Sequence, residues 1–261
     1  MLSLKVLGIN KSRKPHVSAE MNLKLVSLNI EGEKHLDICL PFIVAQQSDV
    51  VCLQEVFGVD VEHIAECLGM EYHFVPTMHI ASSNKYNIAP RGDWGAALFT
   101  KLPHEPFGQH YYKGTGTIPE FVEPNSGDRV LLSVEVTKNE QRYVVATTHF
   151  TWSGNGRVHQ DQREDFERLQ QVVSTLPPHV LCGDFNSPRG GEMYTRFLQL
   201  YQDGLPSTVT TTIDGSLHYA GALELVVDTV FFQAPLVATV TTVVEGVSDH
   251  KGLVATVTQT E

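Results

Sequence analysis

The sequence predicts an α+β fold, a four-layered α/β/β/α sandwich of two mixed, mostly antiparallel sheets flanked by helices. First, about a dozen segments have the apolar or alternating pattern of β-strands, whereas about four have the periodicity of amphipathic helices. Second, short polar turns join several pairs of strands and helices come between others, as expected for mixed sheets with helices outside. Apolar residues make up 42% of the 261 residues, so the chain can bury a sizeable core.

Four segments are expected to be helices. Apolar residues recur at helical spacing, as Leu36 and Leu40 do on one face of the first segment. Gly69 is expected to stop the second helix, and the Pro177-Pro178 pair is expected to stop the third. The expected helices are residues 35–47, 59–68, 163–176 and 192–200.

The expected strands are apolar runs or alternations of apolar and polar residues. Residues 129–136 and 142–150 alternate and are joined by a short polar turn. Loops are expected at 77–93 and 151–162, and a hairpin or a loop at 107–119. The expected strands are residues 23–30, 49–54, 71–75, 94–100, 129–136, 142–150, 180–182, 208–213, 225–232, 236–244 and 253–258.

The regular pattern of strands and helices begins at Met21. Residues 1–20 stand apart as an N-terminal extension, which could be an arm, an edge strand or a tail. No internal repeat or low-complexity linker divides the rest of the chain. Residues 21–261 are therefore expected to form one domain, and we expect a monomer.

The formal net charge of −11 argues against tight, sequence-independent binding of nucleic acid, because such binders normally carry a basic surface. It does not exclude an enzyme whose carboxylates hold a divalent cation. No apolar run is long enough to span a membrane. The cysteines lack zinc-binding spacing, so we interpret them as buried hydrophobes in a reducing compartment and expect a cytoplasmic location. They are Cys39, Cys52, Cys67 and Cys182.

Residues 180–188, Val-Leu-Cys-Gly-Asp-Phe-Asn-Ser-Pro, combine a short apolar strand with two polar side chains at its end. If the chain is still extended there, Asp184 and Asn186 point to the same face. A carboxylate that only accepts, beside an amide that donates and accepts, could hold a water and a phosphate oxygen together. The alternative is a turn in which these side chains cap their own backbone.

Other polar residues fall at or just beyond the ends of predicted strands, and the strand ends of one sheet can meet at one rim. Oxygen ligands of this kind suit Mg²⁺, and carboxylates and imidazoles can move protons or bind a phosphate. Glu55 could instead end its strand in solvent. Asp228 lies in an apolar run, where it needs a partner such as His250, although that pair could be purely structural. The residues at strand ends are Asn29, Glu31, Glu55, His149, Asp184, Asn186, Asp228, Asp249 and His250.

Six short motifs run in order through the chain, within residues 23–258. They are Leu28-Asn29-Ile30-Glu31, Leu53-Gln54-Glu55-Val56, Gly95-Ala96-Ala97-Leu98-Phe99-Thr100-Lys101, Thr147-Thr148-His149-Phe150, Gly183-Asp184-Phe185-Asn186 and Ser248-Asp249-His250. Together they resemble the endonuclease/exonuclease/phosphatase superfamily, which includes deoxyribonuclease I, apurinic endonucleases, sphingomyelinases and inositol-polyphosphate phosphatases. The resemblance implies a deoxyribonuclease I-like sandwich and a metal-dependent phosphoric ester hydrolase.

The resemblance implies a metal site as well. Glu55 would be the main ligand of Mg²⁺, for which Mn²⁺ could substitute, and Asn29 would lie beside it. Asp249 would hold the metal or its waters. Glu31 stands where some relatives place an aspartate on the metal side.

The resemblance also implies roles in catalysis. Asp184 would orient and activate the attacking water, and Asn186 would contact the phosphate. His250, oriented by Asp228, would bind the scissile phosphate or act as a base. The family usually has Leu-Asp-Tyr-Ile/Val where this chain has Val-Asp-Thr-Val, so the match at Asp228 is incomplete. His149 resembles the second histidine of the deoxyribonuclease and sphingomyelinase branches, which would stabilise the phosphate or the leaving group.

The substrate is left open. DNA or RNA is the first expectation, because loop residues could stack on bases and contact phosphates. The alternative is a phosphatase or phosphodiesterase of a phospholipid or a phosphorylated small molecule, with which the acidic net charge is compatible. A minor alternative is a non-catalytic binding module on the same fold. The predicted substrate-binding residues are Lys85, Arg91, Trp152 and Asn155, and the segment 107–119 adds Tyr111, Tyr112 and Lys113.

Overall fold

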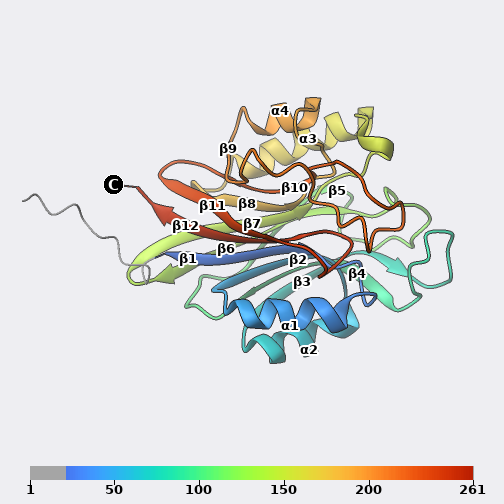
Figure 1. Ribbon diagram of the computed structural model, residues 1–261, viewed down its shortest axis with the longest axis horizontal. Helices are drawn as coiled ribbons and strands as arrows, with labels where there is room; N and C mark the ends of the chain where they lie inside the picture. The colour runs from blue at the N-terminus through green and yellow to red at the C-terminus, as the bar shows by residue number, and fades with distance from the viewer. Residues whose placement is uncertain (1–21, 261) are drawn as a thin grey trace, which may run out of the picture.

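The computed structural model describes residues 22–260, and within them the chain forms two six-stranded sheets (Figure 1). The expected extension at residues 1–20 lies outside the described residues. The first sheet, in spatial order, consists of β11 (Leu236–Val244), β12 (Gly252–Gln259), β1 (Leu23–Asn29), β2 (Val50–Phe57), β4 (Gly92–Thr100) and β3 (Glu71–Ile80). The second consists of β5 (Gly108–Lys113), β6 (Arg129–Lys138), β7 (Gln141–His149), β8 (Val180–Asp184), β10 (Asp228–Phe232) and β9 (Gln202–Asp203).

Helices cover the outer face of each sheet, so the molecule has four layers and the predicted α+β sandwich is confirmed (Figure 1). One buried apolar cluster lies between the sheets, and two others lie between a sheet and its helices. No helix in the described part of the chain is long and apolar enough to cross a membrane. The helices are α1 (Leu36–Gln46) and α2 (Gly58–Leu68) on the first sheet, and α3 (Gln160–Val173) and α4 (Glu192–Phe197) on the second.

The cysteines are distributed differently from the expectation. Cys39, Cys52 and Cys182 are buried, but Cys67 is exposed because it falls outside the apolar stripe of α2. Cys52 of β2 and Cys182 of β8 belong to the cluster between the sheets, where Cys182 Sγ donates to Ala146 O at 3.6 Å.

The expected loop at 77–93 is wrong at both of its ends. β3 continues to Ile80 and β4 begins at Gly92, so the connection covers only residues 81–91. Pro76 suggests a strand end because it cannot donate to a ladder. It is tolerated here because β3 is the edge strand of its sheet, and the register shifts between Pro76 and Met78.

The expected strands at 208–213 and 225–227 are absent from the described residues, which instead form an irregular connection there. The Oγ1 of Thr212 accepts the backbone N–H groups of Val227 and Asp228 at 3.0 and 3.1 Å. Ile213 makes only an isolated bridge to His250. Side-chain capping and one bridge therefore replace a ladder, and β10 begins only at Asp228.

The strand ends that carry the polar motifs meet at one end of the sandwich. β1 runs parallel to β2, and β7 runs parallel to β8, with His149 opposite Asp184. β10 and β12 run antiparallel to these strands and begin at the same end, with Asp228 opposite Asp184. β12 ends at Gln259, at the opposite end of the sheets (Figure 1).

Candidate active site

Asp184 lies at the centre of a group of polar side chains contributed by both sheets. Its Oδ2 accepts a hydrogen bond from Asn29 Nδ2 at 3.2 Å, and it lies 3.5 Å from His149 Nε2 and 3.8 Å from His250 Nε2. The Asp184 side chain is only 3% exposed. Asn29 and His250 come from the first sheet and its flanking segment, whereas His149 and Asp184 end strands of the second. The site is therefore assembled across the seam between the sheets.

The turn at Asp184 supports this arrangement. Its Oδ1 accepts the backbone N–H of Asn186 at 2.8 Å, and Asn186 has a φ of +47°. Asn186 Nδ2 donates to Phe150 O at 3.2 Å. The turn of the alternative interpretation is therefore present, and it uses one carboxylate oxygen while the other faces the imidazoles.

Asp228 and His250 form a buried pair. Asp228 Oδ2 lies 2.8 Å from His250 Nδ1, and the two side chains are 4% and 10% exposed. Because an ionised carboxylate only accepts hydrogen bonds, Nδ1 carries a proton. The His250 ring is thereby oriented so that Nε2 faces Asp184.

Glu55 leaves the ladder of β2 through a β-bulge. Gln54 pairs with Ala96 and Val56 pairs with Gly95, so Glu55 has no partner opposite it on β4. Its φ of +61° is strained for a residue with a Cβ, and such strain is often found at functional sites. Bulges re-aim side chains next to active sites. Here Glu55 Oε1 lies 3.8 Å from His149 Nε2.

The two histidines differ in charge at neutral pH. Burial lowers the pKa of His149 to about 4, although Asp184 acts in the other direction. Burial also disfavours the charged form of His250, but the carboxylates of Asp228, Asp184 and Asp249 outweigh it and raise its pKa well above the usual value. The site therefore offers one imidazolium and one neutral imidazole.

The donor atoms of the site fit a divalent cation. Burial, reinforced by the charge of Asp249, raises the pKa of Glu55 to about 8. Such a carboxylate ionises fully at neutral pH only beside additional positive charge, which a divalent cation supplies. Asp184, Asp228 and His250 also bring ligand atoms within 4.8 Å of one another, although Asp228 already engages Nδ1 of His250.

Glu31 and Arg91 make contacts of their own. The Glu31 carboxylate bonds to Lys34, and it lies 3.1 Å from His35 Nε2. Arg91 donates two hydrogen bonds to Asp60, at 2.6 and 2.9 Å. To bind a metal, Glu31 would have to share its carboxylate between the cation and Lys34 or His35. To bind a substrate, Arg91 would have to share its guanidinium between the substrate and Asp60.

The other predicted substrate-binding residues lie in loops. Lys85 Nζ lies 5.1 Å from the centre of the Tyr86 ring. Trp152 is 41% exposed, and its backbone exchanges two hydrogen bonds with the Asn125 side chain. Asn155 lies in the short 3-10 helix Gly154–Gly156. Contacts of these residues with a substrate stay predictions.

Arg129, which sequence reasoning missed, is buried at the start of β6. It is 2% exposed, and its Nη2 donates to Pro124 O at 2.7 Å and to Asn125 Oδ1 at 3.1 Å. Burial lowers its pKa, whereas charges that include Glu55 and Asp184 raise it. A signal was present in the sequence, since a cation that begins an apolar strand needs partners.

Comparisons with known proteins identify the family and the fold of the chain. The sequence model described as the Endonuclease/Exonuclease/phosphatase family matches residues 26–250. No curated protein sequence matches the chain.

Solved structures share the fold at low sequence identity. The mannosyl-6-phosphatase of Bacteroides thetaiotaomicron is 16% identical with a TM-score of 0.68, over 90% of this chain and 99% of that one. The catalytic domain of human Nocturnin is 18% identical with a TM-score of 0.63, over 92% and 94%. TDP2 of D. rerio, complexed with a single-strand DNA product, is 15% identical with a TM-score of 0.65, over 91% and 99%.

The family match covers most of the chain, and the strand-end motifs meet at one site as the resemblance implies. Divalent metals are generally used by enzymes of this family. The chain belongs to the endonuclease/exonuclease/phosphatase family, whose members are phosphoric ester hydrolases.

Proposed function

We propose that the chain is a Mg²⁺-dependent phosphodiesterase that hydrolyses P–O bonds of DNA or RNA by in-line attack of water. The observation that supports this proposal is the position of Asp184, whose Oδ2 is shared among Asn29, His149 and His250. A buried carboxylate in contact with an imidazolium and a neutral imidazole suits proton transfer beside a phosphate. The free thiols of the cysteines support a reducing, cytoplasmic location.

In this mechanism each residue of the seam has one task. Asp184, whose pKa is raised by burial, accepts the proton of the attacking water. His250, held by Asp228, places its positive charge beside a phosphate oxygen. Neutral His149 donates a hydrogen bond to the phosphate or to the leaving group. Asn186 contacts the phosphate through its amide.

Asn29, Glu55 and Asp249 are the residues that we propose for Mg²⁺, with Glu31 at the margin. When bound, the cation supplies positive charge to the phosphate, which is where most catalysis of phosphoryl transfer lies. The protein supplies the oxygen donors and keeps them in place through the bulge at Glu55 and the end of β1.

The decisive experiment is a substrate panel run with Mg²⁺ and with a chelator. It compares single- and double-stranded nucleic acids, phospholipids and inositol phosphates. We expect Asp184→Asn to abolish metal-dependent turnover and Asp37→Asn, at an exposed position on α1, to leave it unchanged. Wild-type turnover by Asp184→Asn would show that the site is wrongly assigned. No binding of Mg²⁺ or Mn²⁺ in a metal titration would favour a non-catalytic binding module.

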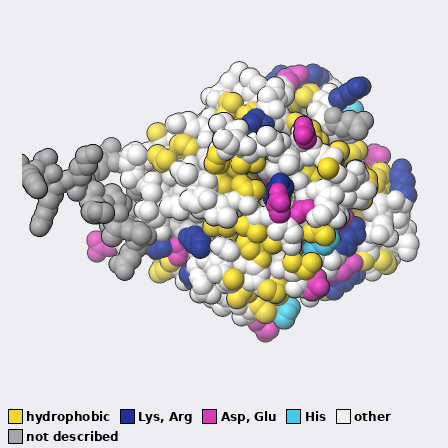
Figure 2. All heavy atoms as spheres, viewed as in Figure 1, with side chains coloured by type: hydrophobic (Ala, Val, Ile, Leu, Met, Phe, Trp, Pro, Cys, Tyr) yellow, Lys and Arg dark blue, Asp and Glu magenta, His cyan; other side chains and the backbone are white. Residues whose placement is uncertain are grey.

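A phosphorylated small molecule or phospholipid is the second candidate, and surface charge favours it. On the described surface seen in Figure 2, Lys and Arg side chains are interspersed with Asp and Glu rather than gathered into one basic area. Salt dependence separates the candidates. Binding of nucleic acid should weaken steeply between 50 and 200 mM salt, as is general for phosphate-backbone contacts. A flat response would identify a small phosphate ester as the substrate.

A further inference from the structure

A loop that the proposed mechanism does not use, residues 214–222, lies against the segment that carries Asp249 and His250. The backbone N–H of Asp214 donates to Asp249 O at 2.8 Å, and Ile213 pairs with His250 in an isolated β-bridge. The base of the loop is therefore tied to two residues of the proposed site.

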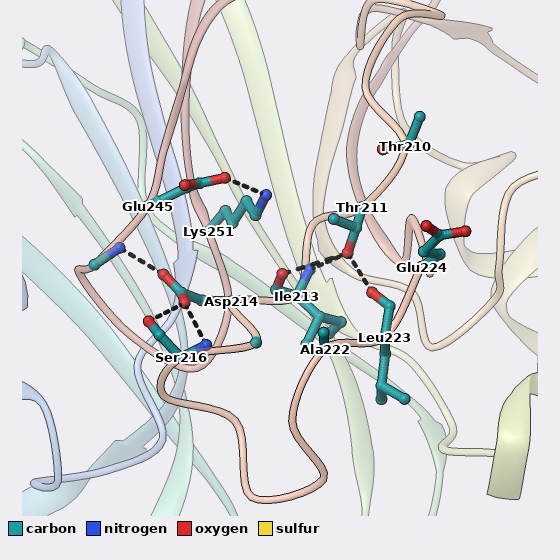
Figure 3. A pocket seen from close by; sticks show the side chains of 12 residues that line it. Thr210, Thr211, Ile213, Asp214, Ser216, Ala222, Leu223, Glu224, Glu245 and Lys251 are labelled. Carbon is teal, nitrogen blue, oxygen red and sulfur yellow. Dashed lines mark hydrogen bonds and ion pairs between the residues drawn. The ribbon is translucent and has the colours of Figure 1, made fainter.

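The loop is fixed at both of its ends. The Asp214 carboxylate accepts the backbone N–H of Ser216 at 2.9 Å and that of Gly246 at 2.6 Å (Figure 3). Where the loop returns, Thr211 Oγ1 donates to Leu223 O at 2.7 Å. A cavity of about 570 Å³ lies at this base. These bonds hold the tip of the loop in a defined place.

The tip of the loop presents two aromatic rings. Tyr219 is 86% exposed, and its ring centre lies 4.6 Å from that of His218. The backbone N–H of Ala220 donates to His218 Nδ1 at 3.2 Å. Because Nδ1 accepts this bond, the neutral imidazole carries its proton on Nε2 and can donate it to a ligand.

His218 lies within electrostatic range of the proposed catalytic group. Burial lowers its pKa, whereas the nearby charges of Asp249, Glu31 and Asp184 raise it and that of His250 lowers it. Four residues of the strand-end group thus act on this one imidazole. Geometry agrees at the base of the loop, where Asp214 bonds to Asp249 and Ile213 pairs with His250, so the loop adjoins the segment that would face the scissile phosphate.

We propose that this loop tip binds a nucleobase of the substrate next to the scissile phosphate, with the base stacked on Tyr219 and an oxygen of the same nucleotide accepting from His218 Nε2. The inference rests on the proposed nuclease function and names a contact for it. A single exposed ring beside a polar donor suits a base, because stacking needs one flat face and tolerates any base. A lipid surface would instead require several adjoining apolar side chains.

Kinetics on two oligonucleotides test this proposal. One is a short single strand with normal bases, and the other has the same phosphodiester backbone with abasic residues. We expect Tyr219→Ala to raise KM about tenfold on the first, with kcat little changed, and to have no effect on the second. Tyr219→Phe should behave as wild type, because the ring is retained. Tyr72→Ala, 38% exposed at the start of β3, is the matched control and should change neither value.

His218 is tested in the same assay. Its contact is to the backbone of the nucleotide, so His218→Ala should raise KM on both oligonucleotides, and His218→Gln, which keeps a donor, should restore part of the loss. In the Asp184→Asn background, a 2-aminopurine in the strand should lose fluorescence on binding, and Tyr219→Ala should prevent that loss.

Two results would overturn the inference alone: an unchanged KM for Tyr219→Ala on the normal strand, or an equal change on both strands. A wild-type protein that cleaves inositol phosphates or phospholipids but neither strand would overturn the nuclease function together with this inference.

Discussion

Replacing Asp228 with Asn removes the negative charge opposite His250 and leaves the size of the side chain almost unchanged. In the structure the Asp228 carboxylate is 4% exposed and bonds to His250 Nδ1 at 2.8 Å. A hydrogen bond between charged groups contributes about 1.5–3 kcal/mol. Since about 1.4 kcal/mol corresponds to a tenfold change in rate, we expect Asp228→Asn to lower kcat/KM about 10- to 150-fold.

The assay measures initial rates on a substrate that the wild type cleaves, with thermal unfolding followed in the same buffer. Asp203→Asn is the matched control. Asp203 lies in β9 of the same sheet and bonds to Arg189 at 2.8 Å, and none of its hydrogen-bond partners among the described residues is a proposed catalytic residue. Both variants should lose stability, but only Asp228→Asn should lose activity. The reasoning is refuted if Asp228→Asn keeps kcat/KM within about twofold of wild type while losing as much stability as the control. The pair would then be purely structural.

Three further predictions concern charge and stability. Glu55→Gln should raise the Tm of the metal-free protein, because the buried Glu55 carboxylate lies near other carboxylates. The same change should abolish the rise in Tm caused by Mg²⁺, and a retained rise would contradict the assignment of Glu55 as a metal ligand. Arg129→Met should lower the free energy of unfolding by about 1–3 kcal/mol, because Pro124 O loses its donor and Asn125 Oδ1 keeps only the N–H of Trp152; urea unfolding with no change would disprove this. Burial lowers the pKa of His179 in the folded state, so the unfolded chain takes up that proton first. Its contribution to stability is therefore fully present above about pH 6.5 and decreases as pH falls. In urea unfolding, His179→Gln should reduce the decrease in the free energy of unfolding between pH 7.5 and 5.5. An unchanged dependence of that free energy on pH would exclude His179 as the source of the decrease.

The layers and most of the site could be predicted from local patterns. Asp184 and Glu55 are recognisable because each follows a short apolar run, and the end of such a run is visible in the sequence. Their relative positions depend on pairings between distant segments, such as the parallel register of β7 with β8. The bulge that turns Glu55 outward depends on its neighbour β4, so no local pattern announces it.

The errors have the same origin. A proline at position 76 locally indicates the end of a strand. β3 continues past Pro76 only because it is the edge strand of its sheet. Residues 208–213 are all β-branched, which favours a strand, but Thr212 caps the start of β10 instead of joining a ladder. His218 lies in an irregular loop, and its composition does not reveal that the base of this loop bonds to Asp249 through Asp214. Long-range contacts decide each of these cases.

Because the site is assembled across the seam between the sheets, the thickness of the apolar core affects the geometry of the site. The first sheet carries Glu55 and the second carries Asp184, so the volume of the residues between the sheets sets how far apart the two halves of the site stand. Cys52 and Cys182 both belong to the apolar cluster between the sheets, each only a few residues before the carboxylate on its own strand. An enlarged side chain at either position would act as a wider spacer, and a displacement of about 1 Å is enough to impair catalysis. Residues with no chemistry of their own thereby hold the reacting groups in register.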